Sequence, residues 1–231
     1  MLQIFLNQYR INMHYRTINV TAMKLGQNAA PGIYEKVLDL LSDSKGSLLD
    51  LGCGSGIVAS LVAARYKHTF DISCSDFNRS AYHAKFPFKV ANLNASALPF
   101  SDQSFDVVLL IEVIEHVEHP AWLLHEMHRI LKKNGMLIMS TPNVENWQSR
   151  LHFLFRSRFF SFLECDMPKH KRMGMGHVNP LFDFQLETLT QDTFVVQDKK
   201  YNRVRIPALN HKIPTSLRLL GEVKIYKLKK I

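Results

Sequence analysis

Leu48–Gly56 reads LLDLGCGSG, and this stretch decides the fold expected for the chain. The apolar residues around Asp50 are typical of a buried strand, and three glycines spaced two apart follow at once. Residues 57–66 then place apolar side chains at helical spacing, so the glycines lie between a strand and a helix. Glycine at such a turn lets a ligand approach the backbone closely, and a helix N-terminus favours a negatively charged group. The stretch therefore predicts a strand, a ligand-binding loop and a helix, in that order.

The chain beyond this loop alternates between short apolar runs and helical periodicity as far as Pro142. Helices are expected over 78–86 and 120–133, the second one ended by Asn134-Gly135. Strands are expected over residues 68–76, 88–94, 105–113 and 136–140. Strands that are almost continuously apolar and alternate with helices indicate a parallel sheet covered on both faces. We therefore predict an α/β protein with a Rossmann-like, doubly wound, mostly parallel sheet that binds ligands beyond the carboxyl ends of its strands.

The remaining segments complete the expected domain organisation. Residues 1–46 are interpreted as an N-terminal helical lead-in, and residues 47–231 as the α/β domain. Within that domain, 143–180 interrupts the alternation with a basic, aromatic segment that we interpret as a lid after strand five. A helix near residues 182–191 and strands at 193–201 and 222–230 are expected to follow. The lysines of the last strand, beginning with Lys224, are ordinary for a strand near a sheet edge.

Composition narrows the class of protein. The 231 residues contain no apolar run near the ~18 residues of a membrane span, and the N-terminus lacks the features of a signal peptide. Three cysteines, none in a CxxC pair, favour neither a disulfide framework nor structural zinc, so we expect a cytoplasmic protein. The net charge of +9 is uneven, because residues 141–231 contain 16 basic and 8 acidic residues. This excess of positive charge therefore concerns the substrate or partner that the C-terminal part would bind.

The glycine spacing separates two ligand classes. A dinucleotide-binding loop of the G-x-G-x-x-G type would need glycine where this chain has Ile57, which disfavours a nicotinamide oxidoreductase. LLDLGCGSG instead resembles the cofactor-binding motif of the class I S-adenosylmethionine-dependent methyltransferases. ALPFSDQSFDVVLLIEVIEHVEHPAWLLHEMHRILKKNGMLIMSTPN extends the resemblance to the small-molecule, ubiquinone-biosynthesis-like branch of that family. The motifs together cover roughly residues 47–145, and they imply S-adenosylmethionine as cofactor and S-adenosylhomocysteine as product.

The resemblance also implies the residues of the cofactor site. Asp76, at the end of the second strand, would accept hydrogen bonds from the ribose hydroxyls, and Phe77 would pack on the adenine. Asn94 occupies the position where the family usually has an aspartate for the adenine amino group, with Asn92 as its competitor. Asp50 would orient the glycine loop and the methionine amino group. The full implied set is Asp50, Gly52, Cys53, Gly54, Gly56, Asp76, Phe77, Asn94, Ala95, Ile111 and Glu112.

The run IEVIEHVEHP, at the end of the fourth strand, holds the candidate catalytic residues. His116 would lie at the rim where the methyl group is presented, and His177 in MGHVNP is a second candidate base for a hydroxyl acceptor. A metal is an alternative interpretation of the neighbouring carboxylates and histidines. The order H-V-E-H and the helix-interrupting Pro120 do not match the H-E-x-x-H pattern of zinc proteases, so no metal is predicted.

The acceptor is the least specified part of the prediction. We expect methyl transfer to an oxygen, carbon or nitrogen of a small-molecule or lipid-linked acceptor. An anionic acceptor would suit the basic and aromatic residues that alternate in the lid. The same residues suit contact with a membrane surface, base stacking, or an amphipathic helix packed on the core. An RNA methyltransferase that uses the basic C-terminal part is therefore an alternative, although no base-flipping motif follows strand four. A non-catalytic protein with this fold is a second alternative, to which Asn94 gives slight support.

Overall fold

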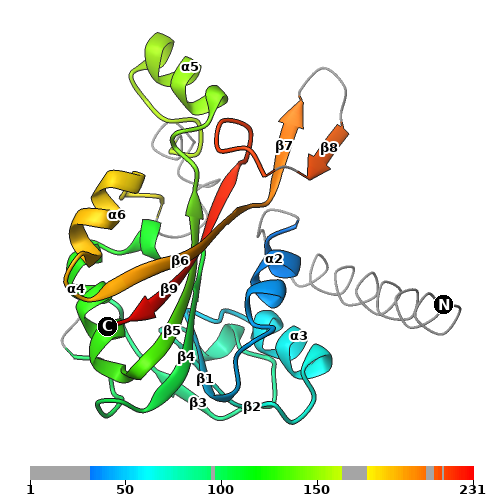
Figure 1. Ribbon diagram of the computed structural model, residues 1–231, viewed down its shortest axis with the longest axis vertical. Helices are drawn as coiled ribbons and strands as arrows, with labels where there is room; N and C mark the ends of the chain where they lie inside the picture. The colour runs from blue at the N-terminus through cyan, green and yellow to red at the C-terminus, as the bar shows by residue number, and fades with distance from the viewer. Residues whose placement is uncertain (1–31, 95–96, 163–175, 207–210, 215) are drawn as a thin grey trace, which may run out of the picture.

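A computed structural model describes residues 32–94, 97–162, 176–206, 211–214 and 216–231. Its centre is a seven-stranded sheet in the order β3-β2-β1-β4-β5-β9-β6 (Figure 1). The strands are β1 (Gly46–Leu51), β2 (Phe70–Asp76), β3 (Phe88–Val90), β4 (Phe105–Ile111), β5 (Leu131–Pro142), β6 (Phe194–Tyr201) and β9 (Val223–Lys230). The first five run parallel, whereas β9 pairs antiparallel with both β5 and β6. This confirms the predicted Rossmann-like, mostly parallel sheet.

Helices cover both faces of the sheet, and each face has its own hydrophobic core. α2 (Ile33–Leu40) and α3 (Ile57–Arg65) pack on one face, where Leu48 and Leu109 belong to their core. α4 (Pro120–Ile130) and α6 (Asp183–Thr190) pack on the other, against a core that includes Leu49. Successive residues of β1 thus face opposite layers, which explains why the strands are apolar throughout. α2, the described part of the N-terminal lead-in, shares its core with β1.

The last strand lies inside the sheet rather than at its edge. β9 is inserted between β5 and β6, and the side chain of Lys224 is fully buried there. Its Nζ donates to Glu145 at 3.0 Å and to Asp183 at 2.9 Å. The expectation of ordinary edge lysines is therefore wrong at this position, because an ammonium with two carboxylate partners is stable where an isolated one is not.

Two predicted helices differ from the observed elements. Over residues 78–86 only a 3-10 turn forms, at Arg79–Ala81. α4 ends at Ile130, and the chain is already extended at Leu131, so that β5 begins five residues before the predicted strand. Asn134 (φ 61°) and Gly135 lie within that strand, beside an irregular register between β4 and β5, and do not end the helix. Leu131 pairs with Phe105 of β4 and its side chain is fully buried, so it belongs to the sheet.

Two elements extend beyond the sheet. The hairpin of β7 (Arg203–Ile206) and β8 (His211–Pro214) forms a separate two-stranded sheet that the sequence analysis did not predict. α5 (Trp147–Arg156) lies past the C-terminal end of β5, at the start of the predicted lid (Figure 1). Residues 163–175 of that lid fall outside the described residues. Within the described part of the chain, no helix is both long and apolar enough to span a bilayer.

Candidate active site

The glycine loop is held between the ends of β1 and β2. The backbone N–H groups of Gly52 and Cys53 both donate to the Ser75 carbonyl, at 2.8 and 3.1 Å. Gly52 has a φ of 74°, and a Cβ built on it would lie 2.5 Å from the Val113 side chain. Gly56 (φ 81°) begins α3 in a similarly left-handed conformation. The chain after β4 thus packs so closely on the loop that only glycine fits at residue 52.

Asp76 forms one side of this loop. Its Oδ2 accepts the N–H of Gly54 at 2.8 Å, and its Oδ1 accepts the N–H of Asn78 at 3.0 Å. Each carboxylate oxygen has a second lone pair, which the proposed hydrogen bonds from ribose hydroxyls would use. Phe77, next to it, is 72% exposed and stands open to a ligand ring. The structure therefore places Asp76 and Phe77 beside the glycine loop, as their proposed roles require.

The buried carboxylate of Asp50 lies near the end of β1, and the partly buried carboxylate of Glu112 directly follows β4. Burial raises the pKa of Asp50 to about 7, against the opposing hydrogen bond from the Ala59 N–H. Burial likewise raises the pKa of Glu112 to about 7, although the Ser140 hydroxyl donates to its Oε1 at 2.8 Å. Glu112 also has a φ of 57°, an uncommon conformation for a side chain of this size and one that clusters at functional sites. A cationic ligand would stabilise the charged form of both carboxylates. The ammonium and sulfonium groups of S-adenosylmethionine are cations of this kind.

Tyr34 of α2 is a residue near the site that the sequence analysis did not single out. Its pKa is raised by burial and by the charges of Asp50 and Glu112, so it lies close enough to both carboxylates to be affected by them. Only the packing of α2 across the sheet brings it there. Its sequence context contains no signal, because an aromatic residue beside a buried helix face usually belongs to the core.

The remaining predicted cofactor residues lie in different surroundings. Ile111 is buried at the end of β4, and Cys53 is buried in the loop with its thiol pKa raised by a hydrogen bond with Cys74 and by burial. Asn94 uses its Oδ1 to accept the Glu118 N–H at 2.9 Å, which ties this loop to the chain before α4. Asn92 in turn accepts the N–H of Asn94 at 3.0 Å. Ala95 lies outside the described residues.

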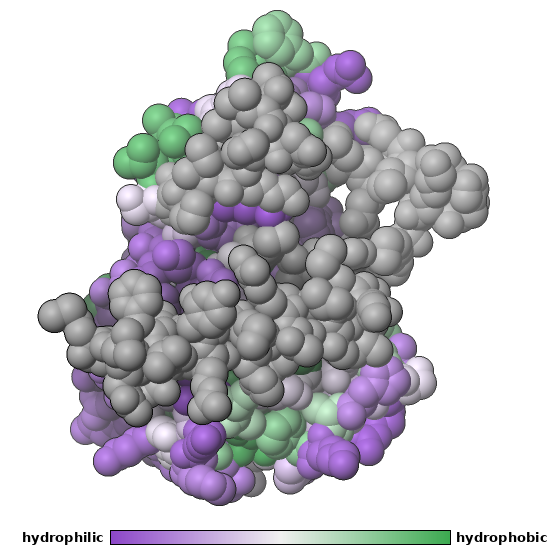
Figure 2. Space-filling model, turned by 90° about the vertical axis from the view of Figure 1, so that its right-hand side faces the viewer, coloured by the Kyte–Doolittle hydropathy of each residue, from purple (hydrophilic) through white to green (hydrophobic). Residues whose placement is uncertain are grey.

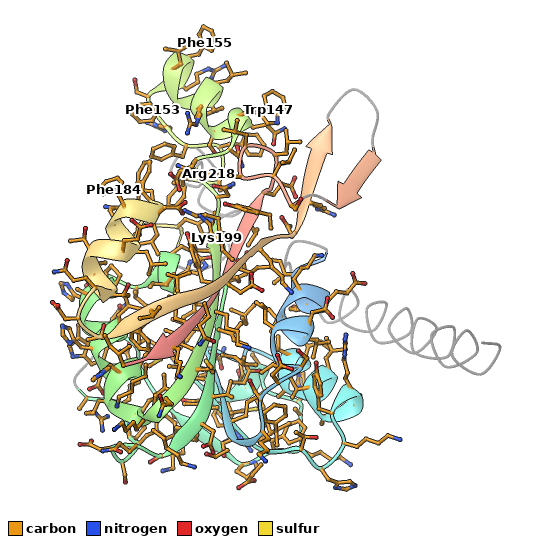
Figure 3. All side chains as sticks on the ribbon, in the orientation of Figure 1. Trp147, Phe153, Phe155, Phe184, Lys199 and Arg218 are labelled. Carbon is orange, nitrogen blue, oxygen red and sulfur yellow. The ribbon has the colours of Figure 1, made fainter. Side chains whose placement is uncertain are left out.

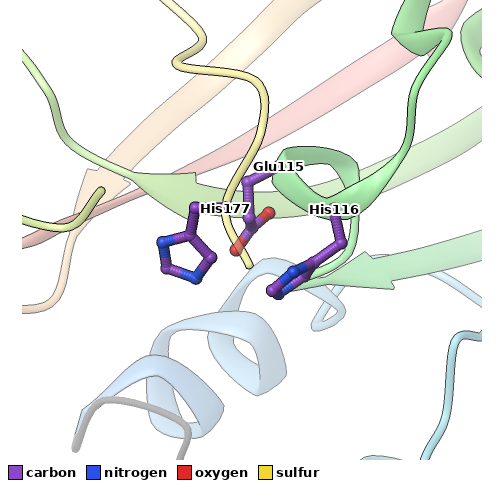
Figure 4. A group of neighbouring side chains, drawn as sticks. All are labelled: Glu115, His116 and His177. Atoms are coloured by element: carbon purple, nitrogen blue, oxygen red, sulfur yellow. The ribbon is translucent and has the colours of Figure 1, made fainter. Parts of the chain in front are cut away.

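The two candidate catalytic histidines meet although they are far apart in sequence. His116 ends the 3-10 turn Ile114–His116 after β4, and its ring centroid lies 4.8 Å from that of His177 (Figure 4). The segment that contains His177 is fastened to this turn, since the N–H groups of Val178 and Asn179 both donate to the Glu115 carbonyl. The Glu115 side chain points between the two rings and is fully buried. Burial and the charge of Glu112 raise its pKa well above the usual value.

Comparison with known proteins agrees with this geometry. A family model described as a methyltransferase domain matches residues 49–139, from β1 to β5. This part of the chain, from β1 to β5, is similar to a methyltransferase domain and makes up less than half of the 231 residues. The ubiquinone biosynthesis O-methyltransferase of Rickettsia felis is 36% identical over 116 residues, which cover 48% of each chain. The ubiquinone/menaquinone biosynthesis C-methyltransferase UbiE of Geotalea uraniireducens is 34% identical over 125 residues, covering 48% of this chain and 52% of its own.

The solved structures extend the likeness of the methyltransferase fold to nearly the whole chain. An S-adenosylmethionine-dependent methyltransferase from Thermotoga maritima superposes with a TM-score of 0.61 over 96% of this chain and all of its own, at 18% identity. At that identity the likeness concerns the fold alone. The curated relatives named above match this chain over only about half of their length. The family and the fold imply S-adenosylmethionine as the cofactor, and the carboxylates around the glycine loop suit it.

Proposed function

We propose that this protein transfers the methyl group of S-adenosylmethionine to a small-molecule or lipid-linked acceptor. The observation that supports this best is the arrangement of Asp50, Asp76 and Glu112. They end three strands that are neighbours in the sheet, around one glycine loop. Parallel strands present their carboxyl ends at one edge of the sheet, which is where ligands of this fold bind.

Each residue has a distinct part in the proposed reaction. Asp76 orients the ribose and keeps the loop in place through Gly54, whereas Asp50 and Glu112 hold the cationic methionine end. The bound sulfonium supplies an activated methyl group, so the protein mainly has to align the acceptor for in-line displacement. Such alignment accounts for up to roughly 7–11 kcal/mol of a barrier. A hydroxyl acceptor also needs to lose its proton, and His116 and His177 lie next to the strand end where this occurs.

The surface of α5 supports a lipid-linked acceptor. Phe153, Leu154 and Phe155 are 49%, 72% and 76% exposed, and Phe160 after the helix is 40% exposed. Figure 3 shows the labelled aromatic residues of α5 standing away from the sheet, and Figure 2 shows hydrophobic residues gathered at this end of the molecule. Contiguous exposed apolar surface of this kind marks a binding or membrane-contact face. Oxygen and carbon both remain candidate acceptor atoms, in line with the two kinds of relative.

An RNA acceptor has weaker support from the structure than from the net charge. Several basic residues of the C-terminal part pair with carboxylates: Lys199 with Asp183, Arg203 with Glu222, Arg218 with Glu145, and Lys224 with both Glu145 and Asp183. Cations that are paired in this way contribute little to a phosphate-binding surface. Among the described residues, these pairs therefore reduce the positive charge that is available to a nucleic acid.

Isothermal titration with S-adenosylmethionine and S-adenosylhomocysteine, with NADH as the unrelated ligand, tests the cofactor. We expect micromolar binding of the two adenosyl ligands, no binding of NADH, and at least tenfold weaker binding in Asp76→Ala. Asp71→Ala is the matched control, because Asp71 lies exposed at the opposite end of β2. A folded wild-type protein that binds neither adenosyl ligand would refute the proposal. Salt-sensitive binding of RNA to the same protein would favour the RNA alternative.

A further inference from the structure

The helix α5 has an unusual relation to the hydrophobic cores of this protein. Of its ten residues only Ser149 is buried, and neither core contains a residue of α5. Its apolar side chains, Leu154 and Phe155 among them, are exposed instead (Figure 3). A surface helix is normally held by an apolar face that packs on the core. Some other interaction therefore holds α5 beyond the end of β5.

Buried polar residues lead into α5 and supply such an interaction. The α5 entry segment, residues 143–146, contains the buried side chains of Asn143, Glu145 and Asn146. The Asn143 side chain donates to two carbonyl oxygens of the loop before β9, at 2.7 and 2.9 Å. The side-chain oxygen of Asn146 accepts the Ser149 N–H at 2.8 Å, which caps the helix. A buried polar group that moves loses its partners, so a satisfied network of this kind specifies one arrangement.

Lys224 of β9 joins the α5 entry segment to the rest of the fold. Its side chain is fully buried, and its Nζ donates to Glu145 at 3.0 Å, to Asp183 at 2.9 Å and to the Leu181 carbonyl at 2.9 Å. These three hydrogen bonds satisfy the three protons of the ammonium. Glu145 precedes α5 and Asp183 begins α6, so one ammonium fixes the starts of both helices on an inner strand of the sheet. Arg218 also pairs with both carboxylates, but half of its side chain is exposed to solvent.

The arrangement that Lys224 imposes explains its buried charge better than stability does. Ion pairs inside proteins contribute little net stability compared with apolar residues of the same volume, because both charges lose their water. An apolar residue at position 224 would, however, place no constraint on where Glu145 and Asp183 lie. We propose that Lys224 is a positioning residue that fixes α5 and, through α5, the surface that meets the acceptor. This inference rests on the proposed function.

The surface of α5 includes an open hollow of about 410 Å³, with Trp147, Leu151 and Phe160 in its lining. Such a hollow suits the apolar part of an acceptor. Its place relative to the cofactor loop depends on the α5 entry segment, since no buried apolar face of the helix fixes it. Methyl transfer needs the acceptor atom in line with the carbon–sulfur bond, and a misplacement of about 1 Å costs up to roughly 100-fold in rate. A contact remote from the cofactor thus influences the rate through the position of α5.

Hydrogen–deuterium exchange of the full-length protein, followed by mass spectrometry, tests the position of α5 without an acceptor. The α5 amides of Lys224→Met should exchange at least about fivefold faster than those of the wild type. A contribution to stability alone predicts a different pattern, because it speeds exchange only at amides that need global unfolding, such as those of β1 and β4. Lys199→Met is the matched control. Lys199 also pairs with Asp183 but not with Glu145, so α5 should exchange in this variant as in the wild type.

The fluorescence of Trp147, at the start of α5, provides an independent measurement. Trp122→Phe, introduced into every protein compared, leaves Trp147 as the one tryptophan of the chain. Acrylamide should quench Trp147 at least about twofold more strongly in Lys224→Met than in the wild type or in Lys199→Met. Where Lys224→Met folds poorly, Glu145→Gln weakens the same ion pair from its other side and should release α5 in the same way.

The outcomes separate this inference from the proposed function. A wild-type protein that binds no S-adenosylmethionine would refute the proposed function and leave the measurements on α5 unaffected. Equal α5 exchange and equal Trp147 quenching in the wild type and Lys224→Met would overturn the inference, whatever the cofactor result. A release of α5 in Lys199→Met as well would also overturn it, because the loss of any neighbouring cation would then suffice.

Isothermal titration completes the comparison of the variants. Lys224→Met should bind S-adenosylmethionine within about twofold of the wild type, because the proposed cofactor residues lie at β1, β2 and β4. Lost cofactor binding in this variant would show a disturbance that is not confined to α5, and it would count against the inference.

Discussion

Asp50→Asn should make the cofactor-free protein more stable above neutral pH and weaken cofactor binding. Asp50 is 2% exposed, and its Oδ2 accepts the Ala59 N–H at 3.1 Å, a bond that the asparagine oxygen keeps. The substitution therefore removes the charge with little change in shape. In the cofactor-free protein the charge of Asp50 is destabilising, because burial disfavours it and the nearby charge of Asp76 repels it. With the cofactor bound, the same charge should attract the cationic methionine end and so strengthen cofactor binding.

The size of the effect follows from the raised pKa. A pKa of about 7 in the folded protein, against 3.8 as the ordinary value, corresponds to about 4 kcal/mol. The folded state binds the Asp50 proton more tightly than the unfolded chain does. The stability that this proton contributes is therefore fully present below about pH 4 and is lost as the pH rises to about 7. The difference in unfolding free energy between Asp50→Asn and the wild type should therefore grow by about 1.4 kcal/mol per pH unit in this interval and then level off.

Urea unfolding at several pH values between 5.5 and 8.5, followed by circular dichroism, measures this difference. Comparison of the two proteins cancels the titration of groups that they share, Glu112 included. Asp71→Asn, at an exposed position, is the control and should show no such trend. A difference that stays flat across the pH range would refute the argument that Asp50 is a strained buried acid. So would unchanged cofactor affinity in Asp50→Asn.

Three further substitutions test other parts of the structure. Gly52→Ala forces alanine into a φ of 74° and brings its Cβ against Val113, so urea unfolding should show a free energy of unfolding lower by about 1–3 kcal/mol. An unchanged free energy of unfolding would mean that the loop rearranges freely. Lys224→Met removes one cation from Glu145 and Asp183, which keep Arg218 and Lys199 as partners, so calorimetry should show a loss of unfolding free energy of about 1–3 kcal/mol; a variant as stable as the wild type would contradict this. Phe155→Asn should leave the unfolding free energy within about 0.5 kcal/mol of the wild type but reduce sedimentation with anionic vesicles. The control Val195→Asn, at an exposed apolar position on β6, should bind the vesicles normally; equal binding by both variants would argue against the membrane-facing surface.

Local patterns in the sequence were sufficient to predict the sheet and the cofactor loop. The motif LLDLGCGSG forms β1, a left-handed glycine loop and the start of α3, and Asp76 ends β2 beside it. These features are predictable because neighbouring residues produce them: a glycine after an apolar strand has few alternatives, and helical or continuous apolar spacing follows from which layer a residue faces. The same patterns failed at Leu131, where pairing with Phe105 of β4 makes an expected helix end part of a strand.

Contacts between distant segments decided what the local patterns left open. Lys224 looks like an edge lysine in the sequence, and only the insertion of β9 between β5 and β6 places it in the interior with Glu145 and Asp183. His177 has no marked context of its own, and it joins Glu115 and His116 because backbone hydrogen bonds fasten its segment to the turn after β4. Such groupings depend on how the chain crosses the sheet, and no spacing along the sequence encodes that path. The glycine loop is therefore predictable from the sequence, whereas the contact between His116 and His177 exists only in the folded chain.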